Sequence, residues 1–155
     1  MQKRFAEAIA ALCRIPVAMA QNVTVLDKAG SHATVFLNPE RAPFVSRTPA
    51  CANHQEPGLS TGIAARAASS LARQQAALRA LASPDATLAR VIEAFMATPI
   101  HSRDRSSPTV YGAVYRPAAL SVDYVWPGHV MSQRIGSFRP GDYVHDYGAA
   151  TTGLS

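Results

Sequence analysis

The stretch Asn22-Val-Thr-Val-Leu-Asp27 and its return, His32-Ala-Thr-Val-Phe-Leu37, decide the fold. Both are short runs rich in β-branched residues, and Lys28-Ala-Gly-Ser31 between them supplies a turn. Each run carries apolar residues at odd and at even positions, whereas a strand with one solvated face alternates apolar and polar residues. The sequence therefore predicts a hairpin in a sheet that is covered on both faces.

Helical patterns lie on either side of this hairpin. Apolar residues recur at helical spacing near the N-terminus, which predicts a helix over residues 2–14 that Pro16 ends. A long alanine-rich helix is predicted over 63–81. A third helix is predicted to begin at Ser83-Pro84-Asp85, where serine serves as N-cap and proline takes the first helical position, and to run to about Ala97.

Further strands are predicted before and after the helices. They are the short pieces 43–46 and 50–53, the hairpin strands 109–115 and 120–126, and a last strand around 143–147. This order predicts an α+β fold with antiparallel sheet and helices packed against it. No repeat or linker divides the chain, so we expect a single domain over residues 1–155.

Composition excludes several functional classes. With 48% hydrophobic and 16% charged residues, the chain has a globular profile. The arginines behind the net charge of +5 are scattered, without the basic patch and interleaved aromatics of a nucleic-acid interface. No apolar run is long enough for a membrane span. Dispersed histidines, without CxxC or HExxH spacing, predict no metal site, and we expect no cofactor.

Two features need individual comment. The N-terminal Lys3-Arg4 and the alanines after it superficially resemble a secretory signal, but Glu7, Arg14 and Pro16 interrupt the apolar core, so we expect a helix and a cytoplasmic protein. The two cysteines, Cys13 and Cys51, lie in amphipathic and apolar surroundings, which predicts buried free thiols.

The stretch Thr48–Gln55 carries the strongest functional signal. It ends an apolar piece with Asn53 and His54, polar side chains at a position where a rigid scaffold presents donors to a substrate. Such a donor suits a site that stabilises an oxyanion. The alternative is that Asn53 merely begins a turn, a place that asparagine favours for local reasons.

Several motifs occur in a characteristic order. They are Leu12-Cys-Arg-Ile-Pro16, Asn22–Asp27 followed by Gly30, Val35-Phe-Leu-Asn-Pro-Glu-Arg41, Asn53-His54-Gln55, Ser70-Leu-Ala-Arg73, the tyrosine-rich hairpin 109–126 with Trp126-Pro-Gly128, and Phe138–Tyr143. Together they resemble the acyl-CoA:6-aminopenicillanic acid acyltransferase family. The resemblance covers nearly the whole chain.

The resemblance implies a fold and a chemistry. The family consists of cysteine-dependent N-terminal-nucleophile hydrolases with a four-layer αββα sandwich, of which this chain would form part. By resemblance, Asn53 holds the oxyanion, Arg73 is an active-site arginine, and His54 and Ser70 are further substrate-binding candidates. The implied substrate is a small acyl-amide or an acyl-CoA-like thioester.

The chain departs from the family in one respect that leaves three hypotheses open. The family's nucleophile lies in an N-terminal part, and this chain resembles the C-terminal half. The chain is then part of a family enzyme, either truncated or completed by an N-terminal partner chain, or it is an inactive remnant or interaction module. In a half-fold, exposed strand edges favour a partner or self-association. In the third hypothesis it is a self-contained hydrolase that uses Cys51 and His54, and this requires a sharp turn at Asn53.

Overall fold

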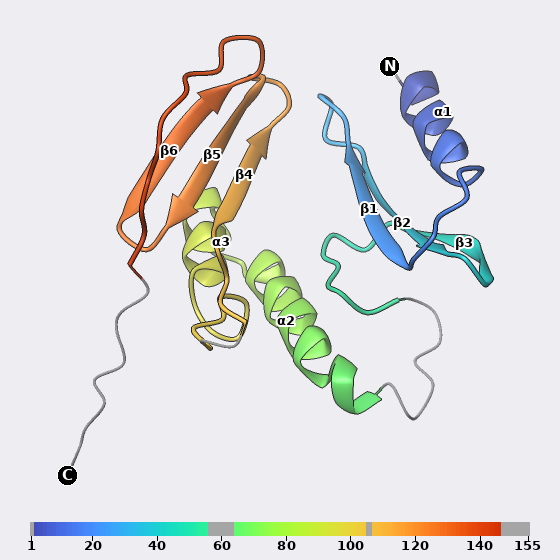
Figure 1. The fold of residues 1–155 in the computed structure, drawn as a ribbon, viewed down its shortest axis with the longest axis horizontal. Coiled ribbons are helices and arrows are strands. Elements are labelled where there is room, and N and C mark those ends of the chain that lie inside the picture. The colour runs from blue at the N-terminus through green and yellow to red at the C-terminus, as the bar shows by residue number, and fades with distance from the viewer. Residues whose placement is uncertain (1, 56–63, 105–106, 147–155) are drawn as a thin grey trace. The chain divides into compact units, whose positions relative to one another are not determined.

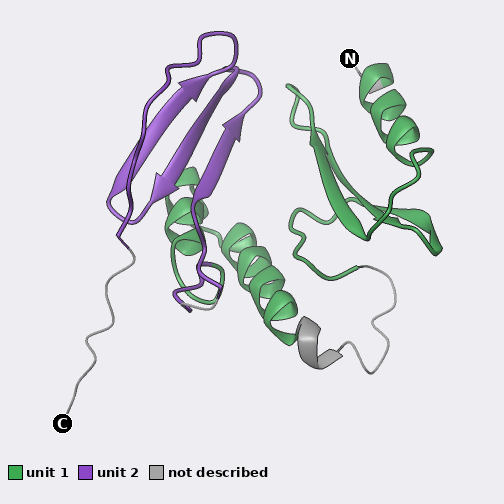
Figure 2. Ribbon diagram, viewed as in Figure 1, with its two compact units in different colours: residues 1–100 green, residues 101–155 purple. Residues whose placement is uncertain are grey.

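The computed structural model describes residues 2–55, 64–104 and 107–146. The chain divides into two compact units, residues 1–100 and 101–155 (Figure 2), and each is described by itself. The single-domain expectation stays a prediction. The predicted loop 56–62, and Tyr147 of the last predicted strand, lie outside the described residues.

The first unit contains the predicted hairpin in a three-stranded antiparallel sheet. Helix α1 (Gln2–Leu12) precedes β1 (Gln21–Leu26), β2 (His32–Asn38) and β3 (Arg41–Ser46), and the strand order is β1-β2-β3 (Figure 1). In the hairpin turn, Asp27 Oδ1 accepts hydrogen bonds from the main-chain nitrogens of Ala29 and Ser31. Gly30 has a φ of 86°, which the absence of a Cβ permits.

The central strand β2 is buried on both faces, as the sequence predicts. The same prediction is wrong for β1, which has no buried residue because it is an edge strand of the sheet. Its residues 33–37 are all buried, and Ala33 and Val35 have an exposure of 0%. One face, with Val35, lies toward α1. Thr34 and Phe36 lie on the opposite face with Thr24 and Asn22, their register partners on β1, and the chain after β3 returns across that face. The predicted strand 50–53 is wrong, because this return segment hydrogen-bonds through side chains instead of pairing with the sheet.

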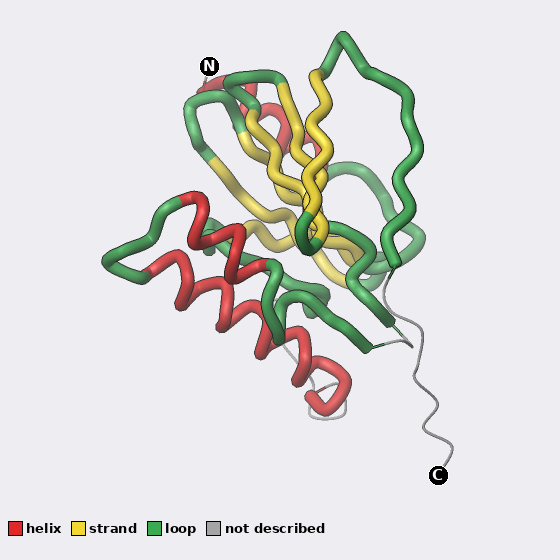
Figure 3. Tube along the Cα trace, turned by 90° about the vertical axis from the view of Figure 1, so that its left-hand side faces the viewer, coloured by secondary structure: helices red, strands yellow, loops and turns green. Residues whose placement is uncertain are grey.

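Two helices complete the first unit. Helix α2 (Ala64–Ala82) and helix α3 (Leu88–Phe95) lie side by side (Figure 3). The predicted N-cap of α3 at Ser83 is wrong. Thr87 caps the helix, its Oγ1 accepting from the Arg90 nitrogen at 3.3 Å. Ser83 instead closes a turn through its carbonyl, which accepts from the nitrogen of Ala86 at 3.0 Å, so α3 begins a turn later.

The second unit is an antiparallel meander of β4 (Gly112–Arg116), β5 (Ser121–Trp126) and β6 (His129–Arg134). The sequence did not predict β6, because Pro127-Gly128 was interpreted as the end of the hairpin. Gly128 has a φ of 76° and turns the chain back into β6. The predicted last strand is wrong over residues 143–146, which form no strand. Tyr143 instead stacks its ring on His129, 3.8 Å between centroids.

The two small antiparallel sheets and the helices of the described residues confirm the α+β class. The four-layer sandwich stays a prediction. Among the described helices, none has both the length and the apolar character that a membrane span requires.

Candidate functional site

The candidate site is formed by the return segment, residues 50–55, between β1 and α2. Asn22 enters it from β1. Its side-chain nitrogen donates to the carbonyl of Ala52 at 2.6 Å and to the carbonyl of His54 at 3.1 Å. Its side-chain oxygen accepts from Gln55 Nε2 at 2.5 Å. Both amide protons and the amide oxygen of Asn22 are therefore used within the segment.

Helix α2 holds the same segment from the other side. Ser70 Oγ lies 3.1 Å from the main-chain nitrogen of His54 and 3.1 Å from its Nδ1. One turn further along, Gln74 Nε2 donates to the carbonyl of Ala50 at 3.0 Å. His54, Ser70 and Gln74 are all buried, so these hydrogen bonds are shielded from water.

Asn53 differs from its neighbours in this segment. Its side chain is exposed and has no hydrogen-bond partner among the described residues, while the residues before and after it are tethered. An amide with free donors, held between fixed neighbours, is available to a ligand. The structure thus brings together Asn53, His54 and Ser70, three of the four residues that the sequence singles out.

Arg73, the fourth, lies on α2 one turn after Ser70. It is half-buried, and its Nε donates to the main-chain oxygen of Ser69 at 3.4 Å, a bond within its own helix. Ser70, Gln74 and Ala77 form the buried stripe of α2 that meets the return segment, and Arg73 adjoins this stripe.

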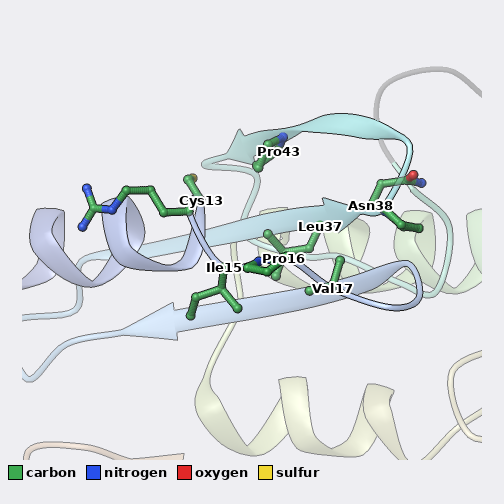
Figure 4. Close-up of a pocket in the computed structure, with 9 residues that line it drawn as sticks. Cys13, Ile15, Pro16, Val17, Leu37, Asn38 and Pro43 are labelled. Atoms are coloured by element: carbon green, nitrogen blue, oxygen red, sulfur yellow. The ribbon is translucent and has the colours of Figure 1, made fainter.

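The two thiols lie in different surroundings. The prediction that Cys51 is buried is wrong: it is exposed, and its sulfur lies 3.6 Å from Thr24 Oγ1. The return segment follows an irregular path that leaves Cys51 exposed, whereas the predicted strand would have buried it. Cys13 is half-buried. It lines a cavity of about 240 Å³ between the end of α1 and the β2–β3 turn (Figure 4).

That cavity belongs to the other side of the sheet. Leu37, which lines it, alternates with Phe36 and so lies on the face opposite Asn22. A second cavity, of about 260 Å³, lies on the Asn22 side and shares Gln55 with the network described above. Its apolar walls include Phe36 and Phe44, whose ring centroids are 6.0 Å apart.

The sequence also matches the model of one protein family, acyl-coenzyme A:6-aminopenicillanic acid acyl-transferase, over residues 2–129 of 155. The chain belongs to this acyltransferase family. The resemblance noted from the sequence motifs is therefore confirmed. No curated protein and no solved structure matches the chain.

Two residues of the candidate site received no role in the sequence interpretation: Asn22 and Gln74. Asn22 was counted only as the first residue of a strand, and Gln74 as a member of an apolar helical stripe. A polar amide in each of these positions was the available signal, because a buried amide needs partners. Their partners lie 24 to 33 residues away along the chain, a distance that local patterns do not bridge.

No group of three or more metal-binding side chains occurs in the part of the chain that the structure describes.

Proposed function

We propose that the chain supplies the oxyanion-binding part of an enzyme that cleaves or transfers acyl groups at amide or thioester bonds. The single observation that carries this proposal is Asn53, an exposed amide whose two neighbours are held in place on both sides. Membership in an acyltransferase family supplies the reaction class. Asn53 is then the donor to the oxygen that becomes negative during the reaction.

The reaction proceeds in two steps. A cysteine thiolate attacks the acyl carbonyl, forming a C–S bond and a tetrahedral oxyanion that the Asn53 amide stabilises. Collapse breaks the substrate's C–N bond or, in a thioester, the substrate's own C–S bond, and the leaving amine or thiolate takes up the proton that the thiol gave to the base. Water or an acceptor amine then attacks the acyl-enzyme and gives a proton to the base; the C–S bond to the enzyme breaks, and the product leaves with the cysteine thiolate restored.

We assign the positive charge of Arg73 to substrate binding near this donor, because Arg73 lies on α2 one turn after Ser70, next to the buried stripe that meets the return segment. The cavity with Phe36 and Phe44 is the proposed seat of the acyl group. At about 260 Å³ it is just below the usual range for ligand pockets, and its apolar walls suit a short acyl chain or one ring.

The proposal places the nucleophile on a cysteine outside these 155 residues, in a partner chain or a preceding segment. Cys13 lines a cavity on the sheet face opposite Asn22, and Cys51 is an internal residue that cannot carry a free α-amine. The family chemistry requires such an amine as the base. The outer edges of β1 and β3 are open in the described sheet, and open edges favour pairing with another chain. Self-association would also cover these edges. Sedimentation of the chain alone and with the partner distinguishes self-association from pairing with a different chain.

The alternative function is an inactive remnant or interaction module. The observation that favours it is the absence of a suitably placed thiol among the described residues. The hypothesis that pairs Cys51 with His54 stays a prediction; Cys51 Sγ lies 3.6 Å from Thr24 Oγ1, and His54 Nδ1 lies 3.1 Å from Ser70 Oγ. Turnover by the chain alone that disappears in Cys51→Ala would support it.

The test is turnover of an acyl-p-nitroanilide and an acyl thioester by the chain alone and by the chain co-expressed with the segment encoded upstream of it. We expect activity only in the second case, reduced about 100-fold or more by Asn53→Ala. The matched control is Gln75→Ala, an exposed amide on α2. Equal rates for wild type and Asn53→Ala overturn the proposal, and no turnover in any preparation supports the inactive alternative.

A further inference from the structure

The side chain of Asn22 donates hydrogen bonds to the residues on both sides of Asn53. Its amide nitrogen donates to the carbonyl of Ala52, the residue before Asn53, and to the carbonyl of His54, the residue after it. One side chain from β1 therefore fixes the peptide group before Asn53 and the peptide group after His54. The distance to the His54 carbonyl, 3.1 Å, is within the usual range for an N–H···O hydrogen bond, and the distance to the Ala52 carbonyl, 2.6 Å, is slightly shorter.

A second side chain holds the same point from α2. The main-chain nitrogen of His54 donates to Ser70 Oγ at 3.1 Å, and both residues are buried. The peptide group after Asn53 is thus bonded at the His54 nitrogen by Ser70, while the His54 carbonyl is bonded by Asn22. Such a segment has little freedom left in its main chain, although it is not part of a strand or helix.

Only an amide fits the position of Asn22. Two carbonyl oxygens face its nitrogen, so the side chain must supply two donors, and Gln55 Nε2 faces its oxygen, so it must also accept. Aspartate would turn a negative oxygen toward two carbonyls, and serine would supply one donor. Because both of its amide protons are used, Asn22 has no donor left for a substrate oxyanion.

We infer that Asn22 and Ser70 are positioning residues that hold the Asn53 amide in place for the reaction. The inference rests on the function proposed above. A donor stabilises an oxyanion only if it is aimed before the charge develops, and a misplacement of about 1 Å costs about 100-fold in rate. His54 and Ser70 then act on catalysis through Asn53 and not by touching the substrate.

The first test measures mobility and does not depend on activity. Asn22→Ala is compared with Thr24→Val, a substitution on the same face of β1. Thr24→Val removes the hydroxyl that contacts Thr34 Oγ1 and Cys51 Sγ. In the wild type, we expect an order parameter of about 0.85 for the Asn53 main-chain amide. Asn22→Ala should lower it below about 0.6, while β2 and the Thr24→Val protein keep the wild-type value. An unchanged Asn53 value in Asn22→Ala overturns the inference.

Ser70→Ala provides a second route if Asn22→Ala does not fold. It leaves the Asn22 bonds and the Gln74 bond to Ala50 intact and removes only the two contacts of Ser70 with His54, so the Asn53 amide should again become mobile. Ser70→Thr keeps the hydroxyl and should restore the order parameter. Equal mobility in the alanine and threonine variants contradicts the role of the hydroxyl.

The second test asks whether Asn22 acts through Asn53. In the active preparation, Asn22→Ala should lower kcat by about 10- to 100-fold with KM changed less than about threefold. In the Asn53→Ala background, the same substitution should cost no further activity, because there is no donor left to position. Fully additive losses overturn the inference. If Asn53→Ala itself leaves turnover unchanged, the oxyanion proposal fails, and the order parameters still decide whether Asn22 holds Asn53.

Discussion

Ser70 Oγ lies 3.1 Å from both the main-chain nitrogen and Nδ1 of His54. A single buried hydroxyl therefore joins helix α2 to the return segment that carries Asn53. Replacing it leaves two buried nitrogen atoms of His54 without that partner. The cost of such a loss is set mainly by the groups left unsatisfied.

Ser70→Ala should lower the free energy of unfolding by about 1–3 kcal/mol for this reason. Urea unfolding followed by far-UV circular dichroism measures the change. Ser69→Ala, at the exposed neighbouring position of the same helix, is the control and should change the free energy by less than about 0.5 kcal/mol. Equal effects of the two substitutions would show that the His54 contact does not stabilise the fold.

Val35 tests the central strand. It is 0% exposed, and truncating it opens a cavity between α1 and the sheet, so Val35→Ala should cost about 2–3 kcal/mol in unfolding free energy. Val130→Ala makes the same change in β6 at a side chain that is 56% exposed, and should cost less than about 0.5 kcal/mol. Comparable losses at both positions would contradict the burial of β2.

The hairpin in β1 and β2 could be predicted because its information is local. Apolar residues at odd and even positions require cover on both faces, and residues 33–37 are indeed buried throughout. Signals that rest on one dipeptide were less reliable. Ser83 is of a residue type that often caps helices, but Thr87 is the N-cap of α3. Pro127-Gly128 was interpreted as an end although it forms a turn within a meander.

The candidate site was only half predictable. Asn53 and His54 were found because they follow each other at the end of an apolar piece. Asn22 was not, because its role depends on bonds to residues 30 to 33 positions away. The irregular path of residues 50–55 likewise depends on side-chain bonds from β1 and α2, which strand patterns do not encode.

Gly30 provides a test of the hairpin turn. An added Cβ would meet no atom within 4 Å, so the cost of Gly30→Ala comes only from the φ of 86°. We expect a loss of about 1 kcal/mol in unfolding free energy. Gly141→Ala, also in open space but without a positive φ, is the control and should leave the stability unchanged or slightly raised. A neutral Gly30→Ala would contradict the turn geometry.

The lowered pKa of Asp123 predicts that the stability of the second unit depends on pH. Side-chain hydrogen bonds from Ser132 and Arg116, each 2.7 Å, hold the pKa of its carboxyl below the ordinary value, against the opposing effect of burial. A lowered pKa in the folded state means that the stabilisation is present above the unfolded pKa of about 4 and disappears as the pH falls through the folded value.

Asp123→Asn should therefore lower the unfolding free energy by about 1 kcal/mol at pH 7, a modest figure because Arg116 is partly exposed. The difference from wild type should shrink below about pH 4. The fluorescence of Trp126, the single tryptophan, reports the unfolding of this unit. Asp142→Asn, at an exposed carboxylate, is the control. A difference that grows toward low pH would contradict the assignment.

The most direct test of the central claim, that Asn53 binds the oxyanion, is inhibition by an acyl aldehyde. Cysteine adds to such an aldehyde to give a tetrahedral adduct whose oxygen occupies the oxyanion position. In the active preparation, Asn53→Ala should raise the inhibition constant about 100-fold or more and leave the KM of the matching amide within about threefold. An inhibition constant that is unchanged, or that rises only in step with KM, would contradict the claim.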